Sequence, residues 1–484
     1  MVSDVCSRCG VLPAAVALYG QSMERNTFGD AIVIGGSMAG LLAARVLADF
    51  FRTVTVIERD EPSERPEPRR GVPQGRHAHG LLLRGQETIC RLFLRIREEL
   101  LAAGATPVNM GRDVKWFHFG VWKCRYHSAL DFISASRPLI EWTLAERVRR
   151  LPNVKTMHGW SAESVIFDGQ RISGVRAHRR DDRETEQRLH ADLVIDASGR
   201  GSQIPLQLRA LGFERPAESA VRIDVGYATC TFRAPSTPRD WKMLYVVAQP
   251  PAKRGGLILP MEGDRWMCTL VGSHGDHPPT DLAGYLAFAK SLPAPDIYEA
   301  LCNAEPLTEP VRYGFQASLR RHYEKLSRFP PGLLVLGDAS CSFNPVYGQG
   351  MSAASMYADV LQSSLQERVA LGWRLDDLWR VFFREAARAA DRPWQLATGE
   401  DFRHPETIGT RGRALRFLHW YTSKVHLAAS VSPQVTERFY EVMHLLKPPT
   451  AMFTPAIMWK LATRRRPPRV AARSSDFEAF ARQR

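Results

Sequence analysis

The sequence predicts an α/β fold in which a discontinuous α/β domain surrounds an inserted β-rich layer and a helical region follows. Three short apolar strands each run into a turn of small residues, near positions 35, 197 and 337. A β-rich stretch separates the second turn from the third, and the chain becomes helical in pattern from about residue 375. Continuous apolar strands are typical of parallel sheets buried on both faces.

Length and composition exclude several protein classes. At roughly 100–200 residues per domain, a chain of 484 residues has room for two to four domains. The hydrophobic share of 44% and the charged share of 24% argue against a disordered or fibrous chain. Since no apolar run reaches the roughly 18 residues that span a bilayer, we expect a soluble, cytoplasmic protein.

The charge is basic but spread along the chain. The 65 Lys and Arg residues exceed the 51 Asp and Glu residues, which gives a net charge of +14. This scatter favours a generally basic surface, so we expect no nucleic-acid partner. Among eight cysteines only Cys6 and Cys9 lie close together, and no second pair of ligands follows them. We therefore predict neither a disulfide framework nor a metal site.

The first glycine turn belongs to a βαβ unit. We expect residues 1–29 to form a disordered extension, and the strand Asp30–Gly35 to begin the fold. A glycine-rich turn, a helical stretch to Phe50 and a second strand that ends in Glu58 follow. This order matches the dinucleotide-binding fingerprint, in which the helix N-terminus faces a pyrophosphate and an acidic residue binds a ribose hydroxyl. Ser37 departs from it, because glycine usually occupies that position.

The second and third turns make the signal specific. Asp196 ends a buried strand before Ser198 and Gly199, and a third strand ends in Gly337 and Asp338. A further small-residue turn at 345–350 precedes a long helix that starts near Met351. A single glycine turn between a strand and a helix also occurs for purely structural reasons, so the combination carries the argument.

In order and spacing the three motifs resemble those of the flavoprotein monooxygenases of the para-hydroxybenzoate hydroxylase fold. The resemblance runs from about Asp30 to Trp394 and includes the polyene epoxidases of polyether biosynthesis and, more distantly, squalene epoxidases. It implies a discontinuous, Rossmann-like FAD-binding domain at 30–215 and 312–395. It also implies an inserted β-rich substrate domain at 216–311 and a C-terminal helical region at 396–484.

The resemblance implies a role for each motif. The first would hold the ADP half of FAD, Asp338 would hydrogen-bond the ribityl chain, and the third would line the isoalloxazine. Arg137 would touch the cofactor from the start of its helix, and Arg76 would lie near the pyrophosphate or the flavin. The amides at a helix N-terminus also stabilise the negative charge of reduced flavin. The predicted cofactor-binding residues are Gly35, Gly36, Ser37, Ala39, Gly40, Glu58, Arg59, Arg76, Arg137, Gly199, Gly337, Asp338, Pro345, Gly348, Gln349, Gly350 and Met351.

One departure from the pattern of the resembling hydroxylases leaves open how FAD is reduced. Ser198-Gly199 stands where these hydroxylases have Asp-Gly, so NAD(P)H would reduce FAD either directly or through a partner flavin reductase. His77 and His79 are interpreted as structural, because no carboxylate lies at short spacing. Flavin halogenases carry a Trp-x-Trp-x-Ile-Pro signature that this chain lacks. A halogenase, an isoprenoid-chain reductase and a non-catalytic redox sensor remain alternatives.

The stretch between the second and third motifs sets the expected substrate. Its four β-rich segments between Val221 and Gly272 are apolar and aromatic, with few ionisable groups, which favours a lipophilic substrate. We predict a monooxygenase that transfers one oxygen atom of O2 through a flavin C4a-hydroperoxide, with alkene epoxidation favoured over hydroxylation. The cofactor supplies this chemistry, so no catalytic side chain is predicted.

The C-terminal part is predicted to be helical. Residues 376–390 have helical periodicity and Pro393 is expected to stop that helix. Residues 415–462 are rich in aromatic residues and Met, and a basic run at 464–469 follows them. We expect a helical cap on the catalytic body, and this region could also contact a membrane surface.

Overall fold

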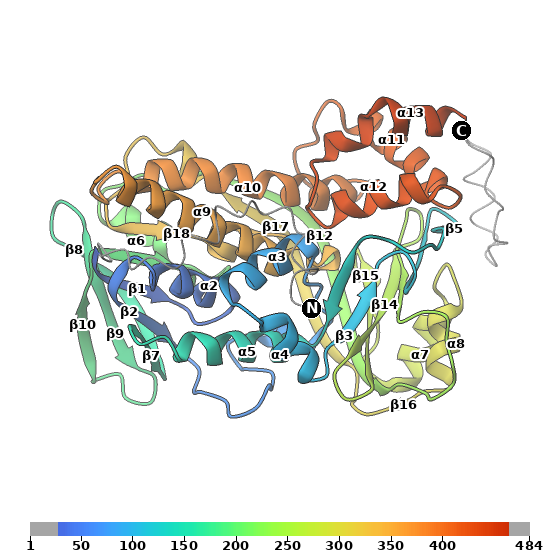
Figure 1. Cartoon of the computed structure of the whole chain (residues 1–484), viewed down its shortest axis with the longest axis horizontal. Helices are drawn as coiled ribbons and strands as arrows, with labels where there is room; N and C mark the ends of the chain where they lie inside the picture. The colour runs from blue at the N-terminus through green and yellow to red at the C-terminus, as the bar shows by residue number, and fades with distance from the viewer. Residues whose placement is uncertain (1–27, 464–484) are drawn as a thin grey trace, which may run out of the picture.

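The computed structural model describes residues 28–463 and has the predicted mixed α/β architecture (Figure 1). Helices lie on both sides of a parallel sheet, a large second sheet stands beside it, and three helices cover one end of that second sheet. Residues 1–27 of the predicted extension (1–29), the pair Cys6 and Cys9 and the basic run at 464–469 lie outside the described residues.

A five-stranded parallel sheet forms the first layer, in the order β18-β11-β1-β2-β7. Its central strand β1 pairs with β11 and β2 in parallel, with Val33 opposite both Ile195 and Val56. These residues are fully buried because helices cover both faces. β1 starts two residues before the predicted boundary, and the first helix ends at Leu47 rather than Phe50. The elements are β1 Phe28–Ile34, α2 Met38–Leu47, β2 Phe51–Glu58, β7 Val154–His158, β11 Leu193–Asp196 and β18 Leu333–Val335.

The second layer is a nine-stranded, mostly antiparallel sheet. The predicted β-rich stretch supplies its centre, and strands from other parts of the chain extend it on both sides. β4 pairs in parallel with β13, although 129 residues separate Val114 from its partner Met243. This non-local pairing leaves no signal in the sequence of β4. The strands are β4 Val114–His118, β5 Val121–Trp122, β12 Glu218–Arg233, β13 Met243–Val246, β14 Arg254–Met261, β15 Arg265–Ser273, β16 Glu305–Pro306, β17 Val311–Arg321 and β19 Cys341–Ser342.

Smaller elements complete the two layers. A three-stranded sheet packs beside the parallel sheet, and a two-stranded sheet precedes the helix that carries Arg137. Their strands are β8 Trp160–Phe167, β9 Ile172–Arg179, β10 Glu186–His190, β3 Thr106–Asn109 and β6 Asp131–Ser134. The surrounding helices are α3 Leu83–Leu92, α4 Ile96–Ala102, α5 Arg137–Arg149, α6 Ile204–Ala210, α7 Leu282–Lys290 and α8 Asp296–Cys302, and short 3-10 turns lie at Pro73–Arg76, Tyr323–Lys325, Gly337–Ala339, Pro345–Tyr347 and Pro449–Phe453.

Two long helices run side by side over the parallel sheet (Figure 1). Helix α9 (Gly350–Ala370) begins where the sequence predicts it, and its first turns are buried against α2. Helix α10 (Leu378–Asp401) continues through Pro393, so the prediction that this proline ends the helix is wrong. Pro393, Ala397 and Asp401 are buried on one side of the helix, and this packing holds the helix together across the lost hydrogen bond. The helix therefore also crosses the predicted domain boundary at 395.

The C-terminal helices share a hydrophobic core with the second layer. Helices α11 (Leu415–Ala428), α12 (Pro433–Met443) and α13 (Pro455–Ala462) gather at one end of the molecule (Figure 1). Tyr421, Val435 and Tyr440 are buried in one cluster with Trp116 of β4 and Phe132 of β6. The C-terminal helices therefore pack into the same hydrophobic core as the second layer.

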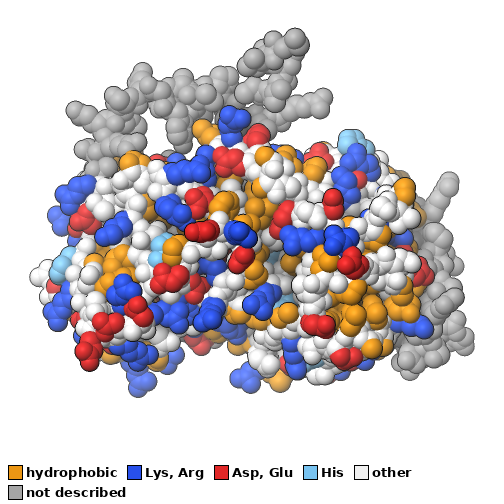
Figure 2. Space-filling model, turned by 90° about the horizontal axis from the view of Figure 1, so that it is seen from below, with side chains coloured by type: hydrophobic (Ala, Val, Ile, Leu, Met, Phe, Trp, Pro, Cys, Tyr) orange, Lys and Arg blue, Asp and Glu red, His pale blue; other side chains and the backbone are white. Residues whose placement is uncertain are grey.

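The surface carries both signs of charge. On the face that Figure 2 shows, Lys and Arg side chains are scattered among Asp and Glu side chains. Within residues 28–463, no helix combines the length and the apolar character that crossing a membrane requires.

Candidate functional site

A cavity of about 920 Å³ joins the two layers. It extends from the carboxyl ends of the parallel strands, beneath the second sheet, to the C-terminal helices. All the predicted cofactor-binding residues line it except Gly40 and Arg76. Gly40 packs behind the lining, and Arg76 is exposed, so the structure does not bring Arg76 to the cavity.

The first motif is shaped by two glycines. Gly35 has a φ of +101°, and a Cβ there would lie 2.6 Å from the carbonyl oxygen of Ala197. A Cβ on Gly40 would lie 1.8 Å from the carbonyl oxygen of Gly35. Only glycine therefore lets α2 start this close to β1, which places the helix N-terminus at the cavity.

Glu58 is fixed at the end of β2. Its Oε2 accepts a hydrogen bond of 2.7 Å from the Gly36 amide, and its Oε1 accepts one of 2.9 Å from the Asp60 amide. The guanidinium of Arg69 lies 3.2 Å from the same carboxylate and also pairs with Glu141. Sequence reasoning missed Arg69, which lies in an irregular segment without a recognisable pattern.

Arg137 is held at the cavity wall by three side chains. Ser136 caps α5 by accepting a hydrogen bond from the Leu139 amide, which sets Arg137 as the first residue of the helix. The Arg137 guanidinium donates to Ser37 Oγ at 3.1 Å, to His79 Nε2 at 3.0 Å and to Glu141 Oε2 at 3.1 Å. The serine that replaces the usual glycine of the first motif therefore holds the arginine.

The two histidines of the 77–79 segment are neutral supports. His79 Nδ1 donates to the His77 carbonyl at 2.8 Å, so that Nε2 is free to accept from Arg137. Burial, and then the charge of Arg137, lowers the pKa of His79 to about 3. His77 Nδ1 lies 2.8 Å from Thr229 Oγ1, and burial lowers its pKa to about 4. Both histidines border the cavity, and their hydrogen bonds agree with the structural interpretation.

The second motif is an ordered turn. Asp196 ends β11, and its carboxylate accepts hydrogen bonds from the Ser198 amide at 3.0 Å and from the Ser202 hydroxyl. Gly199 has a φ of +83° and borders the cavity. Asp196 is 1% exposed and its carboxylate is occupied by the turn, so it does not replace the acid that Ser198 lacks.

The third motif presents unpaired polar groups to the cavity. Asp338 is exposed to the open cavity, and desolvation by the surrounding protein raises the pKa of its carboxyl although Arg137 and Arg200 oppose the shift. Gln349 is 1% exposed, and neither Oε1 nor Nε2 has a hydrogen-bond partner within residues 28–463. Gly350 begins α9 with open space beside its Cα. Buried amide groups without partners are uncommon, so these groups fit a polar cofactor.

A buried network supports this motif from behind. Asp401 Oδ1 accepts from Asn344 Nδ2 and from the Tyr347 hydroxyl, both at 2.8 Å. The Tyr227 hydroxyl donates to Asn344 Oδ1 at 3.0 Å. Asp401 is fully buried, and desolvation raises its pKa to about 7.

The far end of the cavity is aromatic. The Tyr245 hydroxyl donates to the Val346 carbonyl at 3.2 Å, which connects this end to the third motif. The ring of Trp116 lies 5.0 Å from that of Tyr245 and 5.5 Å from that of Phe439. These side chains come from β4, β13 and α12. We call this part of the cavity the aromatic chamber; its wall also includes Val425, Met452, Phe453, His118 and His426.

A cluster of nitrogen bases lies at the chamber wall, with His118 and His426 lining the cavity and Lys123 behind them. The rings of His118 and His426 are 4.3 Å apart, and Phe119 stacks on His426. Lys123 Nζ lies 2.9 Å from His426 Nδ1 and 2.9 Å from the His426 carbonyl oxygen. Lys123 is 3% exposed, and burial lowers its pKa to about 7.

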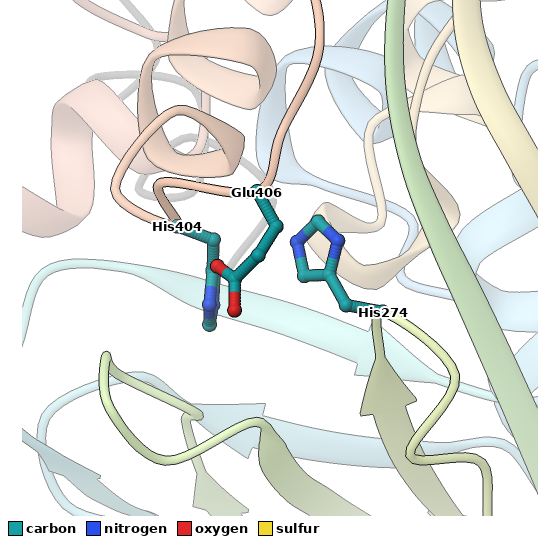
Figure 3. A group of neighbouring side chains, drawn as sticks. All are labelled: His274, His404 and Glu406. Carbon is teal, nitrogen blue, oxygen red and sulfur yellow. The ribbon is translucent and has the colours of Figure 1, made fainter.

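His274, His404 and Glu406 form a further group near the cavity (Figure 3), with ligand atoms within 4.8 Å of one another. Histidine and glutamate side chains commonly bind metal ions. No pattern in the sequence predicted that these three residues would lie together. However, Lys253 Nζ already lies 3.1 Å from Glu406 and supplies a positive charge there.

Comparisons with known proteins show the family to which the chain belongs. A family model described as "FAD binding domain" matches residues 29–392. "Protein Rv3254" of Mycobacterium tuberculosis is 34% identical over 440 residues, which cover 87% of this chain and 90% of that protein.

Solved structures share the fold at low sequence identity. The flavin-dependent brominase Bmp2 is 14% identical with a TM-score of 0.63, and the match covers 94% of this chain and 99% of that one. A flavoprotein/dehydrogenase from Cytophaga hutchinsonii is 17% identical with a TM-score of 0.62, covering 90% and 97%. PqsL of Pseudomonas aeruginosa, described as a probable FAD-dependent monooxygenase, is 17% identical with a TM-score of 0.56, and the match covers 77% of this chain and 97% of that one.

Proposed function

Because the chain belongs to the FAD binding domain family, we propose that it is an FAD-dependent monooxygenase that inserts one oxygen atom of O2 into a lipophilic substrate. One observation carries the proposal: the three motifs and the aromatic chamber line the same cavity. A cofactor held by the motifs would therefore lie in the same enclosed space as the substrate.

The residues present fit FAD. Glu58 would bind the adenosine ribose, the α2 N-terminus and Arg137 would face the phosphates, and Asp338 would bind the ribityl chain. The unpaired amide of Gln349 and the bare start of α9 would face the flavin. Once reduced, FAD supplies the chemistry that activates O2.

The chain's own task is to position the substrate and exclude water. Trp116, Tyr245 and Phe439 form an apolar wall from three elements, which binds a lipophilic molecule and keeps water from the reacting atoms. Tyr245 also ties that wall to the third motif through the Val346 carbonyl, so the substrate and cofactor ends have a fixed relation.

Two oxygen-transfer reactions are proposed. Alkene epoxidation comes first, because the chamber is mostly aromatic and aliphatic and the resembling polyene epoxidases act on such substrates. Hydroxylation comes second, and a specific observation favours it: His118, His426 and Lys123 place proton-accepting nitrogens in or beside the aromatic wall.

The source of electrons is NAD(P)H, used directly or through a partner flavin reductase. Ser198 leaves the second motif without the acid of the related hydroxylases, and Asp196 is occupied by its own turn. This supports a reductase partner.

Helices α11 and α13 are proposed as a peripheral contact with a membrane. Phe417, Trp420 and Trp459 are at least half exposed there, and Lys460 adds positive charge. The chamber wall uses the buried side of α11, so a lipophilic substrate could enter from that surface. Sedimentation with anionic vesicles tests the contact, and Trp420→Ser with Trp459→Ser should weaken it.

The proposed reaction is tested by incubating the FAD-loaded protein with a flavin reductase, NADPH, isotope-labelled O2 and candidate polyenes, terpenoids and phenols. A product that gains one labelled oxygen atom supports monooxygenation. A gain of two hydrogens identifies a reductase, and a halogen in the presence of halide salts identifies a halogenase. If no candidate increases oxygen consumption or changes in mass, a non-catalytic flavin sensor is favoured instead.

A further inference from the structure

We infer that Lys123 and His426 form a proton-accepting pair in the chamber wall that binds an acidic hydroxyl group of the substrate, phenolic or enolic, and takes its proton. This inference rests on the second of the two proposed reactions, hydroxylation, and names the substrate class that the same chamber would bind for it. It also identifies a polar anchor that the aromatic wall alone does not provide.

The pair is built by segments that lie far apart in sequence. Lys123 follows the short strand β5, and His426 lies on the buried side of α11, 303 residues later. Lys123 Nζ is 2.9 Å from both Nδ1 and the carbonyl oxygen of His426. Two contacts to one residue fix the ammonium or amine group beside the ring, and Phe439 covers it at 5.5 Å.

His426 connects Lys123 with the cavity. Its ring is clamped between Phe119, which stacks at 4.7 Å, and Phe439, which meets it edge-on at 4.8 Å. His426 lines the cavity, and its Nε2 makes no hydrogen bond with any group in residues 28–463. The contact with Lys123 uses Nδ1, so Nε2 is the atom left to meet a ligand.

The surrounding charges favour a neutral pair. His118 of β4 and Arg403 next to α10 face His426, and Cys124 adjoins Lys123. Glu400 engages Arg403 through two contacts of 2.6 and 3.1 Å, so this arginine already has its counter-ion. Burial lowers the pKa of Lys123 to about 7 and lowers that of His426 well below its ordinary value. A neutral amine beside a neutral imidazole is therefore accessible near neutral pH.

The neutral pair can move one proton without any other reactant. The amine of Lys123 accepts the Nδ1–H of His426, which leaves Nε2 with a free lone pair. As the substrate O–H bond breaks, an Nε2–H bond forms; the Nδ1–H bond breaks as a third N–H bond forms on Lys123. The substrate becomes an oxyanion, Lys123 becomes an ammonium, and His426 remains neutral.

A hydroxyl fits this site better than a carboxylate. A carboxylate is already ionised at neutral pH and would need a permanent positive charge, whereas the nearby Arg403 is paired with Glu400. A weakly acidic hydroxyl enters the apolar chamber as a neutral molecule and ionises only on contact with the pair. Ionisation enriches an aromatic or enolic carbon in electrons, which suits attack on an electrophilic oxygen.

Nitrophenols and their methyl ethers test the assignment, because nitrophenolate absorbs visible light and the ether has no proton to lose. We would titrate FAD-loaded protein with 4-nitrophenol, 4-nitro-1-naphthol and the two ethers, and follow difference spectra across the pH range. The expected result is that the bound phenols ionise at a lower pH than in solution and bind more tightly than the ethers. The assignment is overturned if the bound phenols ionise at the same pH as in solution, or if the ethers bind as tightly as the phenols. It is also overturned if 4-nitrobenzoate binds more tightly than the phenols, or if neither phenol binds.

Variants separate the pair from general packing. Lys123→Met should reduce the phenolate signal at neutral pH about tenfold, a shift of about one pKa unit, with ether affinity and flavin content unchanged. Lys424→Met, on the same helix as His426, is the matched control and should keep the signal. An unchanged signal in Lys123→Met contradicts the pair; if that variant does not fold, the wild-type pH titration decides. Because binding needs no turnover, a failed oxygenation assay would count against the proposed function without affecting this result.

Discussion

The two ends of the cavity are built in different ways. At the cofactor end, groups come from turns directly after strands: Gly35 after β1, Gly199 after β11 and Asp338 after β18. At the chamber end, Trp116, Tyr245, His426 and Phe439 come from four elements of three regions of the chain. The first end depends on local backbone geometry, and the second on packing between distant segments.

The two ends of the cavity should therefore tolerate different kinds of substitution. The carboxyl edge of a parallel sheet holds the cofactor through glycines and helix N-termini, so small changes of backbone shape should remove binding. The chamber binds through side-chain surfaces, so changes there should alter the substrate and leave the cofactor in place. The following variants test the contrast from the largest expected effect to the smallest.

Gly40→Ala should have the largest effect. The new Cβ would lie 1.8 Å from the Gly35 carbonyl oxygen, so α2 must move away from β1 and from the cavity. We expect loss of bound flavin and a decrease of about 1–3 kcal/mol in the free energy of unfolding. Flavin absorbance and denaturant unfolding measure both quantities. Gly412→Ala, at an exposed site with open space, is the control, and normal flavin content in Gly40→Ala would show that the first motif does not need this close approach.

Asp338→Ala should weaken FAD binding without affecting the fold. Loss of a hydrogen bond that involves a charged group costs about 1.5–3 kcal/mol, which corresponds to roughly 10–100-fold in affinity. Fluorescence titration with FAD measures the change, and Asp376→Ala at an exposed position serves as the control. Unchanged affinity would remove Asp338 from the cofactor site.

Asp401→Asn tests the network behind the third motif. Because the pKa of Asp401 is raised to about 7 in the folded protein, its carboxyl binds a proton more tightly in the folded state than in the unfolded state. This contribution to stability is greatest at acidic pH, and it decreases as the pH rises from about 4 to about 7. Asp401→Asn should flatten that part of the stability profile, measured by denaturant unfolding at several pH values. An unchanged profile would mean that Asp401 ionises normally.

Ser198→Asp should have the smallest effect of these variants. It should change only the rate at which NADPH reduces the bound FAD. If Ser198 makes direct docking of NADPH poor, wild-type FAD should be reduced slowly by NADPH alone and quickly with a flavin reductase. Adding the acid should change the rate of direct reduction and leave oxygen transfer unchanged, which stopped-flow absorbance follows as bleaching of the flavin. Rapid bleaching of the wild-type protein by NADPH would show that the missing acid has no consequence.

The sequence predicts the cofactor end well, because its signals are local. Gly35, Gly348 and Gly350 lie in short motifs whose spacing alone implies a turn and a helix start, and the structure brings them to one cavity. Arg76 is the exception, since it ends the short 3-10 turn Pro73–Arg76, whose direction no periodicity indicates. Arg69, in the irregular segment before that turn, reaches Glu58 instead.

The chamber end could not be predicted in the same way. The pairing of β4 with β13 and the contact of Lys123 with His426 join residues more than a hundred positions apart, and one sequence contains no record of such contacts. The prediction for Pro393 was wrong for a related reason. Local propensity ends a helix at proline, whereas burial of α10 on both sides of Pro393 keeps the helix intact.

The central claim is that the motif-lined end of the cavity binds FAD independently of the chamber. Titration of the purified protein with FAD, followed by flavin absorbance and fluorescence, tests it most directly in wild type, Gly40→Ala and Lys123→Met. We expect saturable, stoichiometric binding in wild type and Lys123→Met and none in Gly40→Ala. Failure of the wild-type protein to bind FAD, or equal binding by Gly40→Ala, would contradict it.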